Sequence, residues 1–380
     1  MTRSADAFEL LEQLREKNGK ERQNYGELEM HLDFKAREKG IPISGKFELT
    51  PQCNFSCKMC YVHLDDTQLK QSVLPVEFWK DLMFQAWKAG MINAKLTGGE
   101  CLIYPGFEEL YLYLRSLGCT VNVLTNGYLL DEKRIQFFKK HKPALMQITL
   151  YGPNDDAYER VTGRRAFTTV VENFKRAKAE GLPVFLAITP NKYLGEDLLE
   201  TIRIAKELTG NVIVNNVFAY PREETGRSEQ RDDADLDLYI RALTYYYQLD
   251  GIEITELSKD SLPPCGGLYH ETSQCGLKCG GGRSAFAIDW KGTMSPCTYL
   301  PQISAFPLRD GFDAAWAKVN REANSWPRIP ECEGCSYETI CVNCAANVLR
   351  YAEAGKQPTV LCERTREFVR SGVIHLPKCE

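Results

Sequence analysis

The chain has 380 residues, with 47 Lys or Arg, 51 Asp or Glu and a formal net charge of −4. Charges of both signs are interspersed, which excludes the basic footprint of a nucleic-acid-binding protein. The N-terminal stretch lacks the apolar core of a signal peptide, and no apolar run reaches about 18 residues, so we expect a cytoplasmic protein without a membrane span. The length suffices for one large α/β domain plus a smaller one.

The 15 cysteines are unevenly distributed along the chain. Three lie between residues 53 and 60, and nine lie between residues 265 and 362. A cysteine content this low is not that of a disulfide scaffold, and in a reducing cytoplasm clustered cysteines indicate metal ligands. The distribution therefore predicts two metal-binding regions.

Residues 1–44 are polar, with helical spacing of apolar residues from Ala7 to Leu14, and we expect one or two helices packed on the outside of the next domain. Residues 45–260 alternate short apolar runs with longer helical patterns, which predicts a parallel sheet with helices outside. Six such units are too few for a closed eight-stranded barrel. The expected strands are Lys46–Thr50, Asn93–Thr97, Thr120–Thr125, Met146–Leu150, Val184–Thr189 and Val212–Phe218. The expected helices are Val76–Ala89, Phe107–Leu117, Phe167–Glu180, Leu198–Leu208 and Leu236–Tyr247.

Three cysteines follow the first expected strand at the spacing C-x3-C-x2-C, namely Cys53, Cys57 and Cys60. A cubane cluster held entirely by protein needs four cysteines, so three leave one iron open for a substrate or cofactor. The same spacing also fits a buried helical stripe, and the C-x2-C pair alone could be half of a zinc site. Pro51 and the polar residues between the cysteines argue against the helical stripe.

Polar motifs also come directly after, or at the end of, four further expected strands. They are Gly98-Gly99-Glu100, Thr125-Asn126-Gly127, Thr149 with Tyr151, and Asn191. The carboxyl ends of the strands build the active site in β/α barrels. Paired glycines let a backbone approach a ligand closely, although glycine motifs also form ordinary turns.

The cysteine motif resembles the signature of the radical S-adenosylmethionine (SAM) enzymes. In that family the three cysteines hold a [4Fe-4S] cluster, SAM chelates its fourth iron, and an electron splits SAM into methionine and a 5′-deoxyadenosyl radical that takes hydrogen from the substrate. The resemblance implies an open (β/α)6 partial barrel and an electron donor such as flavodoxin or ferredoxin. It implies that SAM is contacted by Tyr61, Gly98, Gly99, Glu100, Asn126, Thr149 and Asn191. Tyr151 replaces an acid that the family often has, so no acid is assigned there.

Beyond residue 260 the Gly and Cys content rises, and we expect the periodic helices to end there. The spacing is C-x12-G-x4-C from Cys279 to Cys297, then C-x2-C-x5-C-x2-C from Cys332 to Cys344. This resembles the SPASM domain, an extension of certain radical SAM enzymes, although its consensus has x3 before the last cysteine. The expected domains are an N-terminal helical segment (1–44), a radical SAM core (45–260) and a small SPASM domain (261–380).

Eight C-terminal thiols make two sets of four, enough for two closed clusters that transfer electrons. The resemblance implies one set of Cys275, Cys279, Cys297 and Cys344, and a second of Cys332, Cys335, Cys341 and Cys362. Cys265 could replace Cys275, and two structural zinc sites are the alternative. With the cluster at the first motif, the expected cofactors are three [4Fe-4S] clusters and SAM. Cys119 is expected in the strand core, whereas Cys101 and Cys379 have no assigned role.

SPASM-bearing enzymes mostly modify peptides or proteins. In the sulfatase maturases an Asp base follows the cysteine that matches Cys297, whereas this chain has Thr298, which weakens that interpretation. The leading hypothesis is a maturase that cross-links or otherwise modifies a ribosomally synthesised peptide, with no catalytic base identified. The alternatives are a dehydrogenase acting on a small molecule or a protein side chain, and a zinc-bound scaffold that is not an enzyme.

Overall fold

The computed structural model describes residues 31–62, 73–215, 236–251, 276–277, 279–328 and 359–371, and a few positions between 330 and 349. Its strands form one eight-stranded sheet in the order β6-β5-β4-β3-β2-β1-β7-β8. The strands are β1 Ser44–Glu48, β2 Asn93–Thr97, β3 Thr120–Thr125, β4 Leu145–Thr149, β5 Val184–Ile188, β6 Val212–Val214, β7 Ala285–Ile288 and β8 Met294–Ser295. The helices are α3 Val76–Lys88, α4 Phe107–Ser116, α5 Glu132–Lys140, α6 Asp155–Thr162, α7 Phe167–Ala179, α8 Asp197–Leu208, α9 Leu236–Leu249, α10 Pro307–Asp310, α11 Phe312–Asn324 and α13 Thr359–Arg370. Two short 3₁₀ helices are η2 Cys101–Ile103 and η4 Pro330–Cys332.

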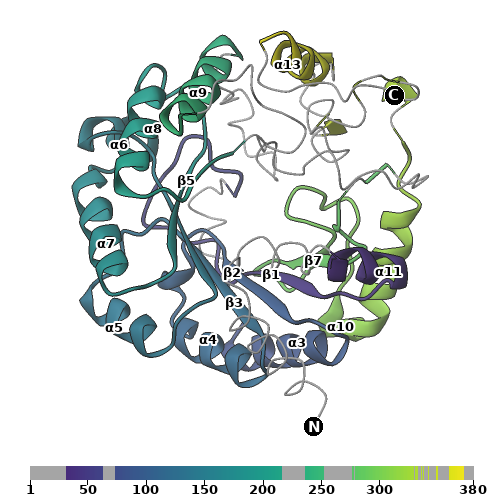
Figure 1. Ribbon diagram of the computed structural model, residues 1–380. Coiled ribbons are helices and arrows are strands. Elements are labelled where there is room, and N and C mark those ends of the chain that lie inside the picture. Colours follow the sequence, from purple (N-terminus) through teal and green to yellow (C-terminus); the bar gives the residue numbers. More distant parts are fainter. Residues whose placement is uncertain are drawn as a thin grey trace, which may run out of the picture.

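The six predicted strands are confirmed as β1 to β6, each parallel to its neighbour. The predicted carboxyl end of the last strand falls outside the described residues. The five predicted helices are confirmed as α3, α4, α7, α8 and α9. Figure 1 shows the sheet curved into an incomplete ring with these helices around its outer side. The predicted α/β partial barrel is therefore confirmed.

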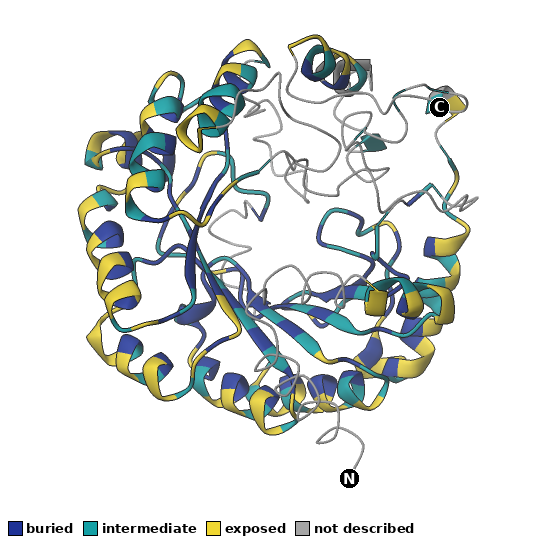
Figure 2. Cartoon of the chain, viewed as in Figure 1, coloured by how far each residue is buried: buried dark blue, intermediate teal, exposed yellow. Residues whose placement is uncertain are grey.

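Alternate residues of the strands point to opposite faces of the sheet. Phe47 of β1, Leu96 of β2 and Val123 of β3 share one register row and are buried in the apolar core with the outer helices. The next row, with Lys46 beside Lys95, therefore faces away from the helices. Figure 2 shows the same division on the helices, which are buried toward the sheet and exposed on the outside. The concave side of the sheet thus carries polar side chains at the position where a barrel holds its active site.

A hairpin from the C-terminal region joins the sheet, which the sequence did not predict. Strand β7 lies parallel to β1, with Ala287 beside Lys46, and β8 returns antiparallel to β7. These strands have four and two residues, which is too short for a recognisable alternation. The expected domain boundary near residue 260 lies outside the described residues.

The expectation that periodic helices end beyond residue 260 is wrong. Helix α11 buries Phe312, Ala315, Trp316, Val319 and Ala323, which are spaced for one face of a helix. The Trp316 indole donates to the carbonyl of Gly40 at 2.7 Å, so α11 is joined to the helical residues 31–39. The rise in Gly and Cys content obscured this amphipathic pattern.

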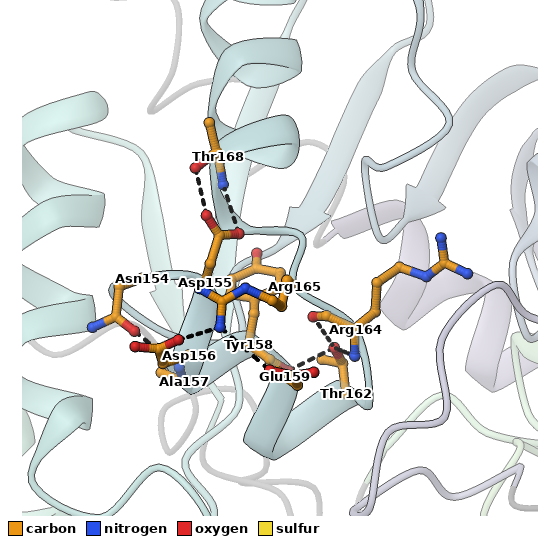
Figure 3. A network of polar contacts seen from close by, with 10 residues as sticks. All are labelled: Asn154, Asp155, Asp156, Ala157, Tyr158, Glu159, Thr162, Arg164, Arg165 and Thr168. Atoms are coloured by element: carbon orange, nitrogen blue, oxygen red, sulfur yellow. Dashed lines mark hydrogen bonds and ion pairs between the residues drawn. The ribbon is translucent and has the colours of Figure 1, made fainter.

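Helix α6 is fixed at its N-terminal end by a network of polar contacts (Figure 3). Asn154 caps the helix, because its Oδ1 accepts from the backbone N–H of Ala157 at 2.9 Å. The Thr168 hydroxyl, at the start of α7, donates to the Asp155 carboxylate at 2.6 Å. This hydrogen bond is the main reason why the pKa of Asp155 is lowered. The ion pairs of Arg165 with Asp156 and Glu159 belong to the same network, but they are exposed and contribute little to stability. The network sets the position of α6, whose other end carries the site.

Candidate cluster and SAM site

The cysteine loop, residues 53–60, begins five residues after β1 and rests on the C-terminal end of α6. The backbone N–H of Ser56 donates to the carbonyl of Thr162 at 2.8 Å, and that of Lys58 donates to the carbonyl of Val161 at 3.0 Å. The last carbonyls of a helix have no partner within the helix, so they are available to such a loop. Residues far apart in the sequence thereby fix the backbone between the cysteines.

The loop after β2 fixes the beginning of the cysteine loop from the other side. The N–H of Gly99 donates to the carbonyl of Thr50, and the N–H of Glu100 donates to that of Gln52, each at 2.8 Å. A Cβ on Gly98 would lie 2.4 Å from the Thr50 oxygen, and one on Gly99 would lie 2.4 Å from the Gln52 oxygen. Gly98 also has φ +148°, in the region that favours glycine. These glycines are needed for the contact between the two loops, whatever ligand they also approach.

Glu100 is fully buried and connects the loops after β2 and β3. One carboxylate oxygen accepts from the Thr125 hydroxyl at 2.8 Å and from the N–H of Leu102 at 3.1 Å. The other accepts from the N–H of Asn126 at 2.8 Å. Burial raises the pKa of Glu100 despite these hydrogen bonds. Its predicted contact with SAM stays a prediction, and both its oxygens have protein donors.

The three thiols of the loop lie in a low-polarity environment. Cys57 is buried, whereas Cys53 and Cys60 are half-buried. Burial raises the pKa of Cys53 to about 12 and raises that of Cys57 as well. Such thiols are neutral unless a cation stabilises their thiolates, and a coordinated metal does so.

Three thiols on one loop are a ligand set that an iron–sulfur cluster accepts. In the part of the chain that the structure describes, no three Cys, His, Asp or Glu side chains are grouped as ligands of one metal ion. A cubane cluster binds one thiolate at each of several irons, so its ligands need not converge on one point. The backbone N–H of Phe55 donates to the Cys53 sulfur at 3.4 Å. Hydrogen bonds to ligand sulfurs are among the features that set the potential of such clusters.

Aromatic residues surround the cysteine loop, and most of them were not predicted from the sequence. The Phe55 ring makes edge contacts with Tyr128, Tyr151 and Tyr158, with centroids 5.7, 6.1 and 6.4 Å apart. The Tyr151 side chain lowers the pKa of the Cys57 thiol, although burial raises that pKa by more. Tyr151, which stands where the family often has an acid, therefore lies near a predicted cluster ligand.

Tyr61 connects the cysteine loop to the C-terminal region. Its hydroxyl donates to the Glu48 carboxylate at the end of β1, at 3.0 Å. Its ring makes an edge contact with Tyr299, with centroids 5.5 Å apart, and Tyr299 lies two residues after Cys297. The SAM contact of Tyr61 stays a prediction, and this ring contact brings a predicted auxiliary ligand into the neighbourhood of the first motif.

The remaining predicted SAM contacts lie at the carboxyl ends of their strands. Thr149 is the last residue of β4 and is half-buried. Asn191 is buried, and its Oδ1 accepts from the N–H groups of Tyr193 and Leu194 at 3.1 and 3.2 Å. This is the local turn that Asn side chains often form. The contacts of both residues with SAM stay predictions.

The C-terminal cysteines are described only in part. The described residues include six half-buried ones: Cys279, Cys297, Cys332, Cys335, Cys341 and Cys362. The predictions for Cys265, Cys275, Cys344 and Cys379 lie outside the described residues. The Cys341 sulfur lies 3.4 Å from the Thr365 hydroxyl, which is one turn along α13 from Cys362. Cys341 therefore lies beside the helix that carries its predicted partner.

The two remaining cysteines of the barrel are core residues. Cys101 is fully buried, and its thiol donates to the carbonyl of Leu124 at 3.3 Å. Cys119 is buried directly before β3, as predicted. Among the described helices, none is long and apolar enough to cross a membrane.

Comparison with known proteins gives a family and a fold. Residues 47–205 match the family model described as the Radical SAM superfamily. Over 330 residues the chain is 24% identical to the AdoMet-dependent heme synthase of Methanosarcina barkeri, a match that covers 81% of this chain and 92% of that protein. Over 163 residues it is 28% identical to the sporulation killing factor maturation protein SkfB of Bacillus subtilis, covering 43% of this chain and only 39% of SkfB.

The fold is similar to that of a known structure, Streptococcus suis SuiB bound to precursor peptide SuiA. The TM-score is 0.64 at 16% sequence identity, over 88% of this chain and 79% of SuiB. The family match covers the strands and loops that carry the cysteine motif, the glycine motif and the motifs after β3, β4 and β5. Residues 47–205 thus relate this chain to the radical SAM enzymes, and the chain is similar to the maturation protein SkfB in sequence and to SuiB in fold.

Proposed function

We propose that this chain is a radical SAM peptide maturase whose cluster is held by Cys53, Cys57 and Cys60. The observation that carries the proposal is that α6 and the loop after β2 hold these three thiols at the carboxyl end of the sheet. When bound, the cluster would supply the electron that cleaves SAM, and the resulting 5′-deoxyadenosyl radical would take hydrogen from the peptide. The residues of this chain would fix the thiols, seat SAM and surround the reacting groups.

We further propose two auxiliary [4Fe-4S] clusters in a SPASM domain over residues 261–380. The contact between Cys341 and Thr365 supports the set that joins Cys341 to Cys362. SAM would lie against the carboxyl ends of the first five strands. The residues proposed to contact it are Tyr61, Gly98, Gly99, Glu100, Asn126, Thr149 and Asn191.

The relatives of this chain support two classes of substrate. SkfB is named as a maturation protein, and SuiB has been described with a precursor peptide, which supports a peptide substrate. The match to the heme synthase covers most of that protein and supports a second candidate, a reaction on a small molecule. Thr298 is buried, and its hydroxyl has no hydrogen-bond partner among the described residues. A hydroxyl here cannot serve as the carboxylate base of a sulfatase maturase.

The proposal is tested by measuring iron and acid-labile sulfide after anaerobic reconstitution. We expect about 12 irons per chain in the wild type and about 8 in a Cys53→Ala/Cys57→Ala/Cys60→Ala variant, as three clusters require. SAM cleavage should be lost in that variant. A matched Cys119→Ala variant, which removes a buried thiol of the core, should retain both the iron content and the SAM cleavage of the wild type. Equal iron in the wild type and the triple variant would contradict the cluster site.

The substrate class is tested by SAM cleavage with candidate substrates. Reduced flavodoxin or ferredoxin would serve as the electron donor. Stimulation by a precursor peptide, but not by a tetrapyrrole, supports the maturase, and the reverse result supports the small-molecule candidate.

A further inference from the structure

Asn126 follows β3, and its side-chain amide has a fixed orientation. Its Oδ1 accepts from the backbone N–H of Tyr128 at 3.0 Å. The oxygen is therefore the end that faces its own loop, and the NH2 group faces the cysteine loop. This leaves both amide hydrogens of Asn126 available to that loop.

Both hydrogens have acceptors in the cysteine loop. Nδ2 lies 2.8 Å from Oδ1 of Asn54 and 3.7 Å from the sulfur of Cys53. The backbone N–H of Phe55 donates to the same sulfur at 3.4 Å. Cys53 thus has two N–H donors directed at its sulfur.

The loop that carries Asn126 is itself held from two sides. The backbone N–H of Asn126 donates to Glu100 at 2.8 Å. From α7, the buried Asn173 amide donates to the carbonyls of Gly127 and Tyr128 at 2.9 and 3.0 Å. These contacts keep the amide donor in place before any cofactor binds, so its direction does not depend on SAM.

We propose that Asn126 is a positioning residue for the cluster, acting through the Cys53 sulfur, in addition to any contact with SAM. This inference rests on the proposed function, because it requires a cluster at the first motif. An N–H donor stabilises negative charge on a ligand sulfur, and reduction adds negative charge to the cluster. Asn126 therefore raises the reduction potential of the cluster, and it aligns Cys53 through Asn54.

The test is the midpoint potential of the SAM-responsive cluster signal in electron paramagnetic resonance, measured on the reconstituted full-length protein. Asn126→Leu has a similar shape without donors, and Asn126→Asp adds a negative charge. We expect the potential to fall in the order wild type, Asn126→Leu, Asn126→Asp. At the potential that half-reduces the wild-type cluster, the ratio of reduced to oxidised cluster in the variants should be lower by about threefold or more. A tenfold change in this ratio corresponds to about 59 mV for a one-electron couple.

Asn173→Leu is the matched control, because it loosens the same loop without removing a donor to sulfur. It should lower the potential by less than Asn126→Leu does, because the donor to the Cys53 sulfur is still present on the loosened loop. Wild-type potentials in both Asn126 variants, or an equal shift in Asn173→Leu, would overturn the inference and leave the proposed function intact. If Asn126→Leu binds no iron, the midpoint potential of the Asn126→Asp variant alone tests the inference. A wild type that forms no SAM-responsive cluster would overturn both proposals.

Discussion

Replacing Gly99 by Ala tests whether the contact between the two loops builds the site. The added Cβ would lie 2.4 Å from the Gln52 carbonyl oxygen and 2.5 Å from that of Pro51, and both atoms belong to the backbone. Reaching an ordinary contact requires a shift of about 1 Å, which stretches the hydrogen bonds from Gly99 to Thr50 and from Glu100 to Gln52 beyond normal length. Two hydrogen bonds and local overpacking together predict a loss of about 2–6 kcal/mol in the free energy of unfolding.

Urea denaturation measures the loss of stability, and iron per chain after reconstitution measures the site. Because Cys53 follows Gln52 directly, the iron content should fall toward the level without the first cluster, by about four irons per chain. Gly210→Ala is the matched control, since no atom lies within 4 Å of its added Cβ, and it should change stability by less than about 0.5 kcal/mol. A Gly99→Ala protein with wild-type stability and iron would refute the argument that close packing requires this glycine.

Three further substitutions test other parts of the framework. Burial raises the pKa of Glu100 in the folded protein. The resulting contribution of Glu100 to the free energy of unfolding is therefore complete below about pH 4.5 and is lost as the pH rises through the raised pKa. The difference in unfolding free energy between the wild type and Glu100→Gln should therefore narrow as the pH rises, and a constant difference in urea titrations would count against this sign. Asn154→Ala removes the cap of α6 and should cost about 0.5–2 kcal/mol in urea denaturation, whereas an unchanged midpoint would show that the cap is not needed. Trp316→Phe removes the donor to the carbonyl of Gly40 and should lower stability by about 1–3 kcal/mol in the same assay, while a smaller loss would mean that water replaces the indole.

The barrel could be predicted because its strands and helices have strong local patterns. Strand β2 and helix α3, for example, begin at the residues expected from alternation and helical spacing. The hairpin of β7 and β8 could not be predicted, because its strands are short and its pairing partner, β1, is more than 230 residues away in the sequence. Helix α11 carried a readable pattern that the cysteine-rich composition hid.

The cysteine and glycine motifs of the site were identifiable from spacing and order. The contacts that position these motifs could not be predicted from the sequence. The carbonyls of Val161 and Thr162 receive the cysteine loop, yet no side-chain type marks a helix end for that use. Asn54 gave a weak signal as a polar residue between cysteines, and its pairing with Asn126 depends on how two distant loops meet.

The ladder between β1 and β7 has a consequence for how electrons could move in this enzyme. Strand β1 leads into the cysteine loop, and the hairpin of β7 and β8 leads into Cys297 two residues later. Both segments belong to one hydrogen-bonded sheet, so neither can swing away from the other without breaking backbone pairs. The fold therefore fixes the distance between the two segments that carry these thiols. A redox exchange between them would proceed at constant range, without a gating motion to bring donor and acceptor together.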